Sequence, residues 1–306
     1  MNEKIQEDIA KQILELKREK NALILAHNYQ ILAVQEIADF VGDSLELSQK
    51  AMEAKKSIIV FCGVRFMAEV AKILNPDAKV LMPRGDAVCP MADMVTPEDI
   101  DELRKQHPDA AVCSYINTNA DLKAVSDVCC TSANASKVVA RLESKKVIFA
   151  PDRNLAAYVQ RGVEKQIIPC NGYCYVHTRF TPSDVESARK AHPKAIVIVH
   201  PECEPDVIDL ADEVLSTSGM LRFARSTDAE EIVVGTEEGL IERMRKEIPE
   251  KRFFSLGRAQ ICSNMKRTRL EDVLVALRDE IDEIRIDDAT IEAARKPLER
   301  MFALIG

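Results

Sequence analysis

One pattern occurs three times along the chain. Residues 96–112 read TPEDIDELRKQHPDAAV, and 85 positions later residues 181–197 read TPSDVESARKAHPKAIV. A first copy lies 87–88 positions upstream, where LKREKNALIL precedes His27 as HPDAAV precedes Ser114. Similarity at a nearly fixed period indicates repeated structural units. We therefore expect three units of one architecture, packed against each other.

Three cysteines hold equivalent places in these copies. Cys89 and Cys262 each lie 62 positions after the histidine that ends the first expected strand of their copy. In the middle copy, Cys174 lies 60 positions after Ser114, and Cys170 is four positions further out of register. Equivalent loops around a pseudo-three-fold axis would direct three thiols at one point. The register therefore predicts a shared central site.

Short β-branched runs alternate with helical patterns in every copy, which is typical of an α/β fold with parallel sheets and crossover helices. In the first copy we expect helices over 34–54 and 65–74. The expected strands are 22–26, 57–61 and 79–82 in the first copy, 110–115, 147–150 and 166–168 in the second, and 195–199, 231–234 and 252–255 in the third. Each third strand precedes a cysteine loop.

Helices are expected after the cysteine loops. Thr96 and Thr181 are each followed by proline, which pairs an N-cap residue with proline at the first helical position. Thr268 with Glu271 predicts a capping box, and an amphipathic helix is expected over 291–303.

The repeat predicts three domains, 1–95, 96–180 and 181–306. The C-terminal helices, 268–306, belong to the third by sequence, but could pack with the first.

Composition excludes several classes of function. The chain has 306 residues, 46% of them hydrophobic and 30% charged, as in ordinary globular proteins. A net charge of −8, without a basic stripe, argues against nucleic-acid partners. No apolar run is long enough to span a membrane, and the charged N-terminus does not resemble a signal peptide. We expect a cytoplasmic protein with no membrane partner, in which nine cysteines do not form a disulfide framework.

Three converging thiolates suit a soft metal centre, either zinc or an iron–sulfur cluster. Structural zinc sites usually contain local pairs such as C-x2-C, whereas here each candidate ligand comes from a separate loop. This spacing favours a cluster over a single ion. A 4Fe–4S cluster held by three cysteines leaves one iron without a protein ligand, and that iron can act as a Lewis acid. Of the remaining cysteines we expect Cys62, Cys113 and Cys129 in the core, whereas Cys130, Cys170 and Cys203 could lie in the core or near the site.

Polar residues follow the first expected strand of every copy: His27-Asn28-Tyr29, Tyr115-Ile116-Asn117 and His200-Pro201-Glu202. Ligands of parallel sheets bind beyond the carboxyl ends of the strands, so these side chains are expected to line one pocket. Histidine and glutamate are common proton carriers near neutral pH.

Small hydroxylic residues recur near expected helix starts: Ser44, Ser132, Ser216 and Thr217. A hydroxyl beside free backbone N–H groups would bind an anion, although ordinary N-capping explains each one taken singly. His177, three residues after Cys174, is expected within reach of the same cavity.

Together these motifs resemble the quinolinate synthase (NadA) family. The resemblance covers nearly the whole chain, from AHNYQ at Ala26 to CSNMK at Cys262. Between them lie GDS, FCGVRFMAE, AVCPMADM, YIN, GYCYVH, HPEC and STSGM. The departures are Ile116, where valine is expected, and Pro90 after the first cluster cysteine.

The resemblance implies three three-layer α/β/α domains around a pseudo-three-fold axis, with one 4Fe–4S cluster held by Cys89, Cys174 and Cys262. It implies condensation of iminoaspartate with dihydroxyacetone phosphate to quinolinate, phosphate and water, in NAD biosynthesis. An aspartate oxidase or dehydrogenase would supply the iminoaspartate. The residues implied in substrate binding are His27, Ser44, Tyr115, Asn117, Ser132, His200, Glu202 and Thr217, to which the hydroxyl pattern adds Ser216.

Glu202 is our hypothesis for the main general base, oriented near His200, with His27, Tyr29 and His177 assisting proton transfer. Two alternatives stay open. Another hydro-lyase with an open iron–sulfur cluster would share these features but would not need dihydroxyacetone phosphate. An iron–sulfur sensor would need an output element, and the sequence shows none.

Overall fold

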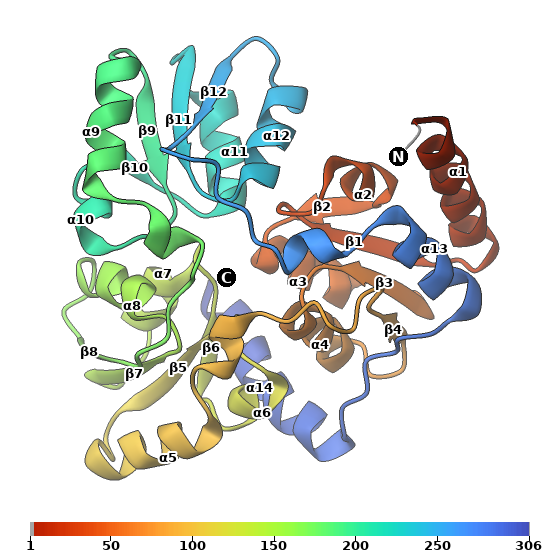
Figure 1. Ribbon diagram of the computed structural model, residues 1–306. Helices are drawn as coiled ribbons and strands as arrows, with labels where there is room; N and C mark the ends of the chain where they lie inside the picture. Colours follow the sequence, from red (N-terminus) through yellow and green to blue (C-terminus); the bar gives the residue numbers. More distant parts are fainter. Residues whose placement is uncertain (1–2, 306) are drawn as a thin grey trace.

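The computed structural model describes residues 3–305 and contains three parallel four-stranded sheets flanked by helices. The strand orders are β2-β1-β3-β4, β6-β5-β7-β8 and β10-β9-β11-β12, which is one topology used three times. Figure 1 shows the three sheets in three lobes around a common centre. The α/β class and the three parallel sheets expected from the repeat are therefore confirmed.

The strands of the first sheet are β1 (Leu23–His27), β2 (Phe40–Gly42), β3 (Ile58–Cys62) and β4 (Lys79–Leu81). Those of the second are β5 (Ala111–Tyr115), β6 (Val128–Cys130), β7 (Lys146–Ala150) and β8 (Gln166–Pro169). Those of the third are β9 (Ile196–Val199), β10 (Glu213–Val214), β11 (Glu231–Gly235) and β12 (Arg252–Ser255). Strands β1, β5 and β9 lie inside their sheets and are almost entirely buried, as is usual where helices cover both faces.

The helices that begin each copy are α1 (Glu3–Glu19), α5 (Pro97–Gln106) and α9 (Pro182–Ala191). As predicted, Thr96 and Thr181 are the N-caps of α5 and α9 and are followed by proline; the structure adds capping boxes with Asp99 and Asp184. The other helices of the first two copies are α2 (Leu32–Ile37), α3 (Ser44–Glu53), α4 (Arg65–Leu74), α6 (Ala120–Ala124), α7 (Ala135–Ala140) and α8 (Arg153–Gln160). The third copy adds α10 (Pro205–Ile208), α11 (Thr217–Ser226), α12 (Glu238–Glu247), α13 (Leu270–Asp279) and α14 (Asp288–Ile305).

The predicted helix 34–54 is wrong, because β2 divides it into α2 and α3. The edge strands β2, β6 and β10 are only two or three residues long, too short to show the alternation by which strands are recognised.

An aspartate directly before the edge strands β2, β6 and β10 repeats with the same role. Asp39, Asp127 and Asp212 each accept the backbone N–H of the second residue of the neighbouring inner strand, at 2.7–2.8 Å. Each also pairs with a cation on the helix that begins its copy: Lys17 on α1, Arg104 on α5 and Arg189 on α9. The three units therefore share a charge-assisted connection between helix, inner strand and edge strand.

The predicted capping box at Thr268 is also wrong. Thr268 is buried, α13 begins one residue later than expected, and Asp272 accepts the backbone N–H of Arg269. The helix predicted over 291–303 is α14, which extends further at both ends.

The two C-terminal helices pack in different places. Helix α13 packs against α1 of the first copy, whereas α14 packs mainly against α6 and β6 of the second. Among residues 3–305, no helix is long and apolar enough to cross a membrane. The domain boundaries 1–95, 96–180 and 181–306 stay predictions.

Candidate active site

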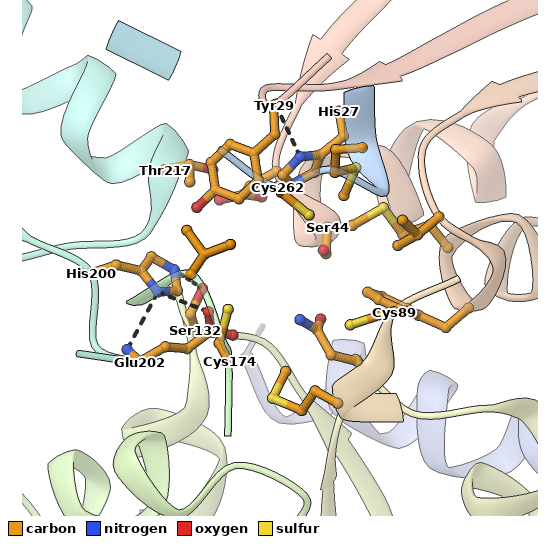
Figure 2. A pocket seen from close by; sticks show the side chains of 18 of the residues that line it. His27, Tyr29, Ser44, Cys89, Ser132, Cys174, His200, Glu202, Thr217 and Cys262 are labelled. Carbon is orange, nitrogen blue, oxygen red and sulfur yellow. Dashed lines mark hydrogen bonds and ion pairs between the residues drawn. The ribbon is translucent and has the colours of Figure 1, made fainter. Parts of the chain in front are cut away.

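The three in-register cysteines lie in equivalent loops, after β4, β8 and β12. Each precedes a short 3₁₀ helix: η1 (Pro90–Asp93), η2 (His177–Arg179) or η3 (Met265–Arg267). Cys89, Cys174 and Cys262 line one cavity of about 70 Å³, and Figure 2 shows their side chains directed into it. All nine cysteines lie in the described residues; the other six are buried, whereas these three are only partly so.

These thiols are difficult to ionise without a cation. Burial and the nearby Cys262 raise the pKa of Cys89 to about 12. Burial and Glu202 raise the pKa of Cys174, and burial raises that of Cys262. A metal centre supplies the positive charge that turns such thiols into thiolate ligands.

Two histidines at strand ends have matching local geometry. The Tyr29 N–H donates to His27 Nδ1 at 3.1 Å, and the Glu202 N–H donates to His200 Nδ1 at 3.3 Å. Burial and His200 lower the pKa of His27 to about 3, so His27 is neutral with its proton on Nε2. Neutral His27 can therefore offer an N–H donor without carrying a charge.

Glu202 is the centre of a buried polar cluster. Its Oε2 lies 2.7 Å from His177 Nδ1 and 3.4 Å from His200 Nδ1, and the two imidazoles stack with centroids 4.4 Å apart. Burial alone would raise the pKa of Glu202, but the imidazoles outweigh it and hold the pKa below its usual range. The other oxygen, Oε1, is buried without a hydrogen-bond partner among the described residues.

Tyr29 connects this cluster to the first copy. Its hydroxyl lies 2.6 Å from Thr236 Oγ1 and 3.4 Å from His177 Nε2, and burial raises its pKa. Thr236 also lies 2.9 Å from His177 Nε2, so it orients both groups. Sequence reasoning missed Thr236, although its position directly after β11 is a signal that could have found it.

Hydroxyls reach the cavity from all three copies. Figure 2 shows Ser44, Ser132 and Thr217 around it, and Ser132 Oγ lies 3.2 Å from His200 Nε2. Ser216 does not line the cavity; it caps α11 and donates to Asp43 Oδ2 at 3.1 Å.

The expected anion-binding amides are partly occupied by the chain itself. Asp43 Oδ1 accepts the N–H groups of Leu45 and Glu46 at the start of α3. The Gly219 N–H in α11 donates to Ser216.

The structure brings most predicted site residues together. His177 and Ser216 do not line the cavity. His177 Nδ1 lies 3.3 Å from the sulfur of Cys174, which does line it. The predicted residues in the lining are His27, Tyr29, Ser44, Cys89, Tyr115, Asn117, Ser132, Cys174, His200, Glu202, Thr217 and Cys262. Sequence reasoning did not single out Asp43, Thr131, Tyr175, nor the apolar Val64, Phe66, Met67, Met91, Val176 and Met265, which also line the cavity.

The donor set fits a metal cofactor. Three sulfurs from three loops surround one space, as a cluster with three cysteine ligands requires. A smaller group is also present: Cys174, His177 and Glu202 offer ligand atoms within 4.8 Å of one another. This second set could hold a single ion, and it shares Cys174 with the first.

Fold and site together define a class. The protein is an α/β protein built from three similar parallel-sheet units, with a central site of cysteines, histidines and a glutamate at the carboxyl ends of the strands.

Comparison with known proteins identifies the family. Residues 11–303 match the family model of the quinolinate synthetase A protein, NadA. The quinolinate synthase of Methanoregula boonei is 51% identical, over 97% of this chain and 98% of the relative. That of Thermodesulfovibrio yellowstonii is 51% identical over 96% and 98%, and that of Caldicellulosiruptor saccharolyticus is 50% identical over 97% and 99%. The chain belongs to the NadA family and is an enzyme.

Proposed function

We propose that the chain is a quinolinate synthase that condenses iminoaspartate with dihydroxyacetone phosphate and releases phosphate and two waters. The observation that carries this proposal is the convergence of Cys89, Cys174 and Cys262 on the cavity that also holds the polar strand-end residues. The names of the close relatives agree with it. The reaction would serve NAD biosynthesis in the cytoplasm, with an aspartate oxidase or dehydrogenase as the source of iminoaspartate.

The three cysteines would hold a 4Fe–4S cluster. When bound, such a cluster supplies a Lewis acid at the iron without a protein ligand, which suits the loss of hydroxide in a dehydration. Burial raises the pKa values of these thiols, so a bound metal centre would be what turns them into thiolate ligands.

We assign binding of iminoaspartate, the dicarboxylate substrate, to uncharged hydrogen-bond donors. The hydroxyls of Ser44, Ser132 and Thr217 face the cavity from three sides and can donate to carboxylate oxygens. Neutral His27 can donate from Nε2. Asn117 Oδ1 is buried without a partner among the described residues, and a substrate N–H would satisfy it.

Proton transfer is assigned to Glu202 as general base. Its Oε2 lies 2.7 Å from His177 Nδ1, whereas His200 Nδ1 accepts the Glu202 backbone N–H, so Oε1 is the carboxylate oxygen left to accept a proton from substrate. The two imidazoles lie close enough to the carboxylate to pass the proton on. Tyr29, on the opposite side of His177, can return a proton to a leaving group.

The test has two measurements on protein purified without oxygen. We expect about four iron and four acid-labile sulfide per chain, and quinolinate formation that requires both substrates. One zinc per chain, without sulfide, would instead point to Cys174, His177 and Glu202 as a single-ion site and would contradict the cluster. A loaded cluster with dehydration of another dicarboxylic acid, independent of dihydroxyacetone phosphate, would indicate the alternative hydro-lyase.

A further inference from the structure

Tyr175 bridges two of the three cysteine loops. It follows Cys174 in the second copy, and its hydroxyl reaches the loop of the third copy, 3.5 Å from Cys262 Sγ. The Ser263 N–H donates to the same hydroxyl oxygen at 3.1 Å. Because the oxygen already accepts from this amide, the phenolic hydrogen is directed away from it and is available to the sulfur. Ser263 Oγ, at 3.3 Å, is the competing acceptor.

The ring of Tyr175 also closes the site on one side. Tyr175 is partly buried and lines the cavity that holds the three cysteines. The Arg179 guanidinium carbon lies 5.4 Å from the ring centroid, which fixes the ring from the solvent side. The residues that follow the other two cysteines are Pro90 and Ser263, so only the second loop brings a phenol.

We propose that the Tyr175 hydroxyl donates a hydrogen bond to Cys262 when this sulfur ligates the cluster, and that it thereby raises the reduction potential of the cluster. This inference rests on the cluster of the proposed function. Hydrogen bonds to ligand sulfurs draw off negative charge, which stabilises the reduced and more negative state. A thiolate ligand is a stronger acceptor than the neutral Ser263 hydroxyl, so ligation directs the phenolic hydrogen to sulfur. Tyr175 is a positioning and tuning residue that does not contact the reacting atoms.

The test compares Tyr175→Phe with wild type in an anaerobic redox titration followed by electron paramagnetic resonance. The Phe variant keeps the ring and its contact with Arg179 but lacks the donor. We expect unchanged iron and sulfide, and a roughly tenfold smaller equilibrium constant for reduction, which is about 59 mV for one electron. The matched control is Tyr173→Phe, because Tyr173 is exposed in the same loop with its ring beside Arg153. The reduction potential of the cluster in this variant should equal that of wild type.

A second variant keeps the inference testable if Tyr175→Phe assembles the cluster poorly. Replacing Tyr175 by 3,5-difluorotyrosine keeps the bridge but makes the phenol a stronger donor, so the potential should move upward. Equal potentials in wild type and both variants, at equal iron content, would overturn the inference and leave the proposed function standing. A wild-type protein without a cluster would overturn both.

Discussion

A buried ion pair positions the third cysteine loop, and its removal should be costly. Glu237 is fully buried at the start of α12, and its Oε1 lies 3.0 Å from Lys266 Nζ. Glu237 also accepts the N–H groups of Gly239 and Cys262, at 2.7 and 3.2 Å. Lys266 donates to the Tyr29 carbonyl at 2.7 Å. The pair therefore connects the Cys262 backbone with a residue of the first copy.

Lys266→Met should destabilise the protein by about 3 kcal/mol. Removing one partner of a buried pair typically costs about 3–5 kcal/mol, because the other charge stays buried and uncompensated. We take the lower end because the Lys266 side chain is 20% exposed. With Glu237→Gln, a double-mutant cycle should give a coupling of about 2 kcal/mol. Urea unfolding followed by circular dichroism measures each free energy.

The loss of stability in Lys266→Met should depend on pH. Burial already raises the pKa of Glu237 above 4.5, and Lys266 opposes that rise. Without Lys266, the Glu237 carboxyl binds a proton more readily in the folded protein than in the unfolded protein. The stability of the variant therefore falls as pH rises above 4.5. The loss should be smaller at about pH 5 than at about pH 8.

The matched control is Lys246→Met, which removes an exposed pair with Glu36 and should change stability little. A loss in Lys266→Met below about 1 kcal/mol, equal at both pH values, would refute the reasoning. So would a coupling below about 0.5 kcal/mol.

Three further outcomes are expected. Cys174→Ala should lose the cluster, whereas Cys62→Ala, a change in the buried sheet, should keep about four iron per chain; equal loss in both would contradict the register argument. Glu202→Gln should lower kcat roughly 10²–10⁴-fold with the cluster intact, and near-normal turnover would exclude it as the general base. Two lysine side chains lower the pKa of Glu280 to about 2, so its contribution to stability is lost as pH falls from 4.5 toward 2. As pH falls through this range, the urea midpoint of Glu280→Gln should therefore fall less steeply than that of wild type. Identical slopes would show that the pairs of Glu280 with the two lysines contribute nothing to stability.

Local patterns predicted the strands that are long enough to show them. The buried, largely apolar runs at β1, β5 and β9 and the Thr-Pro helix starts are local signals, and the structure agrees with them. The edge strand β2 was missed because its three residues lie inside the longer helical pattern expected over 34–54, and its place depends on pairing with β1. The shifted start of α13 at Leu270 has a similar cause, since α13 packs on α1, far away in sequence.

In the candidate site, the repeat register was sufficient to select three of nine cysteines and the polar strand ends. The convergence of Cys89, Cys174 and Cys262 follows from it, because equivalent loops of equivalent units meet at one axis. The position of Thr236 directly after β11 is a sequence signal, but its contacts with Tyr29 and His177 join three copies and are visible only in the structure.

The sequence by itself therefore determined the repeated α/β unit, the three equivalent cysteines and the strand-end residues, since period and register are properties of the chain alone. Only the tertiary structure decided which groups meet across copies. Tyr175 reaches Cys262, Asp43 accepts from Ser216, and Glu202 Oε2 lies beside two stacked imidazoles. The physical reason is that such contacts depend on how three packed units are oriented, and no local pattern of residues encodes that orientation.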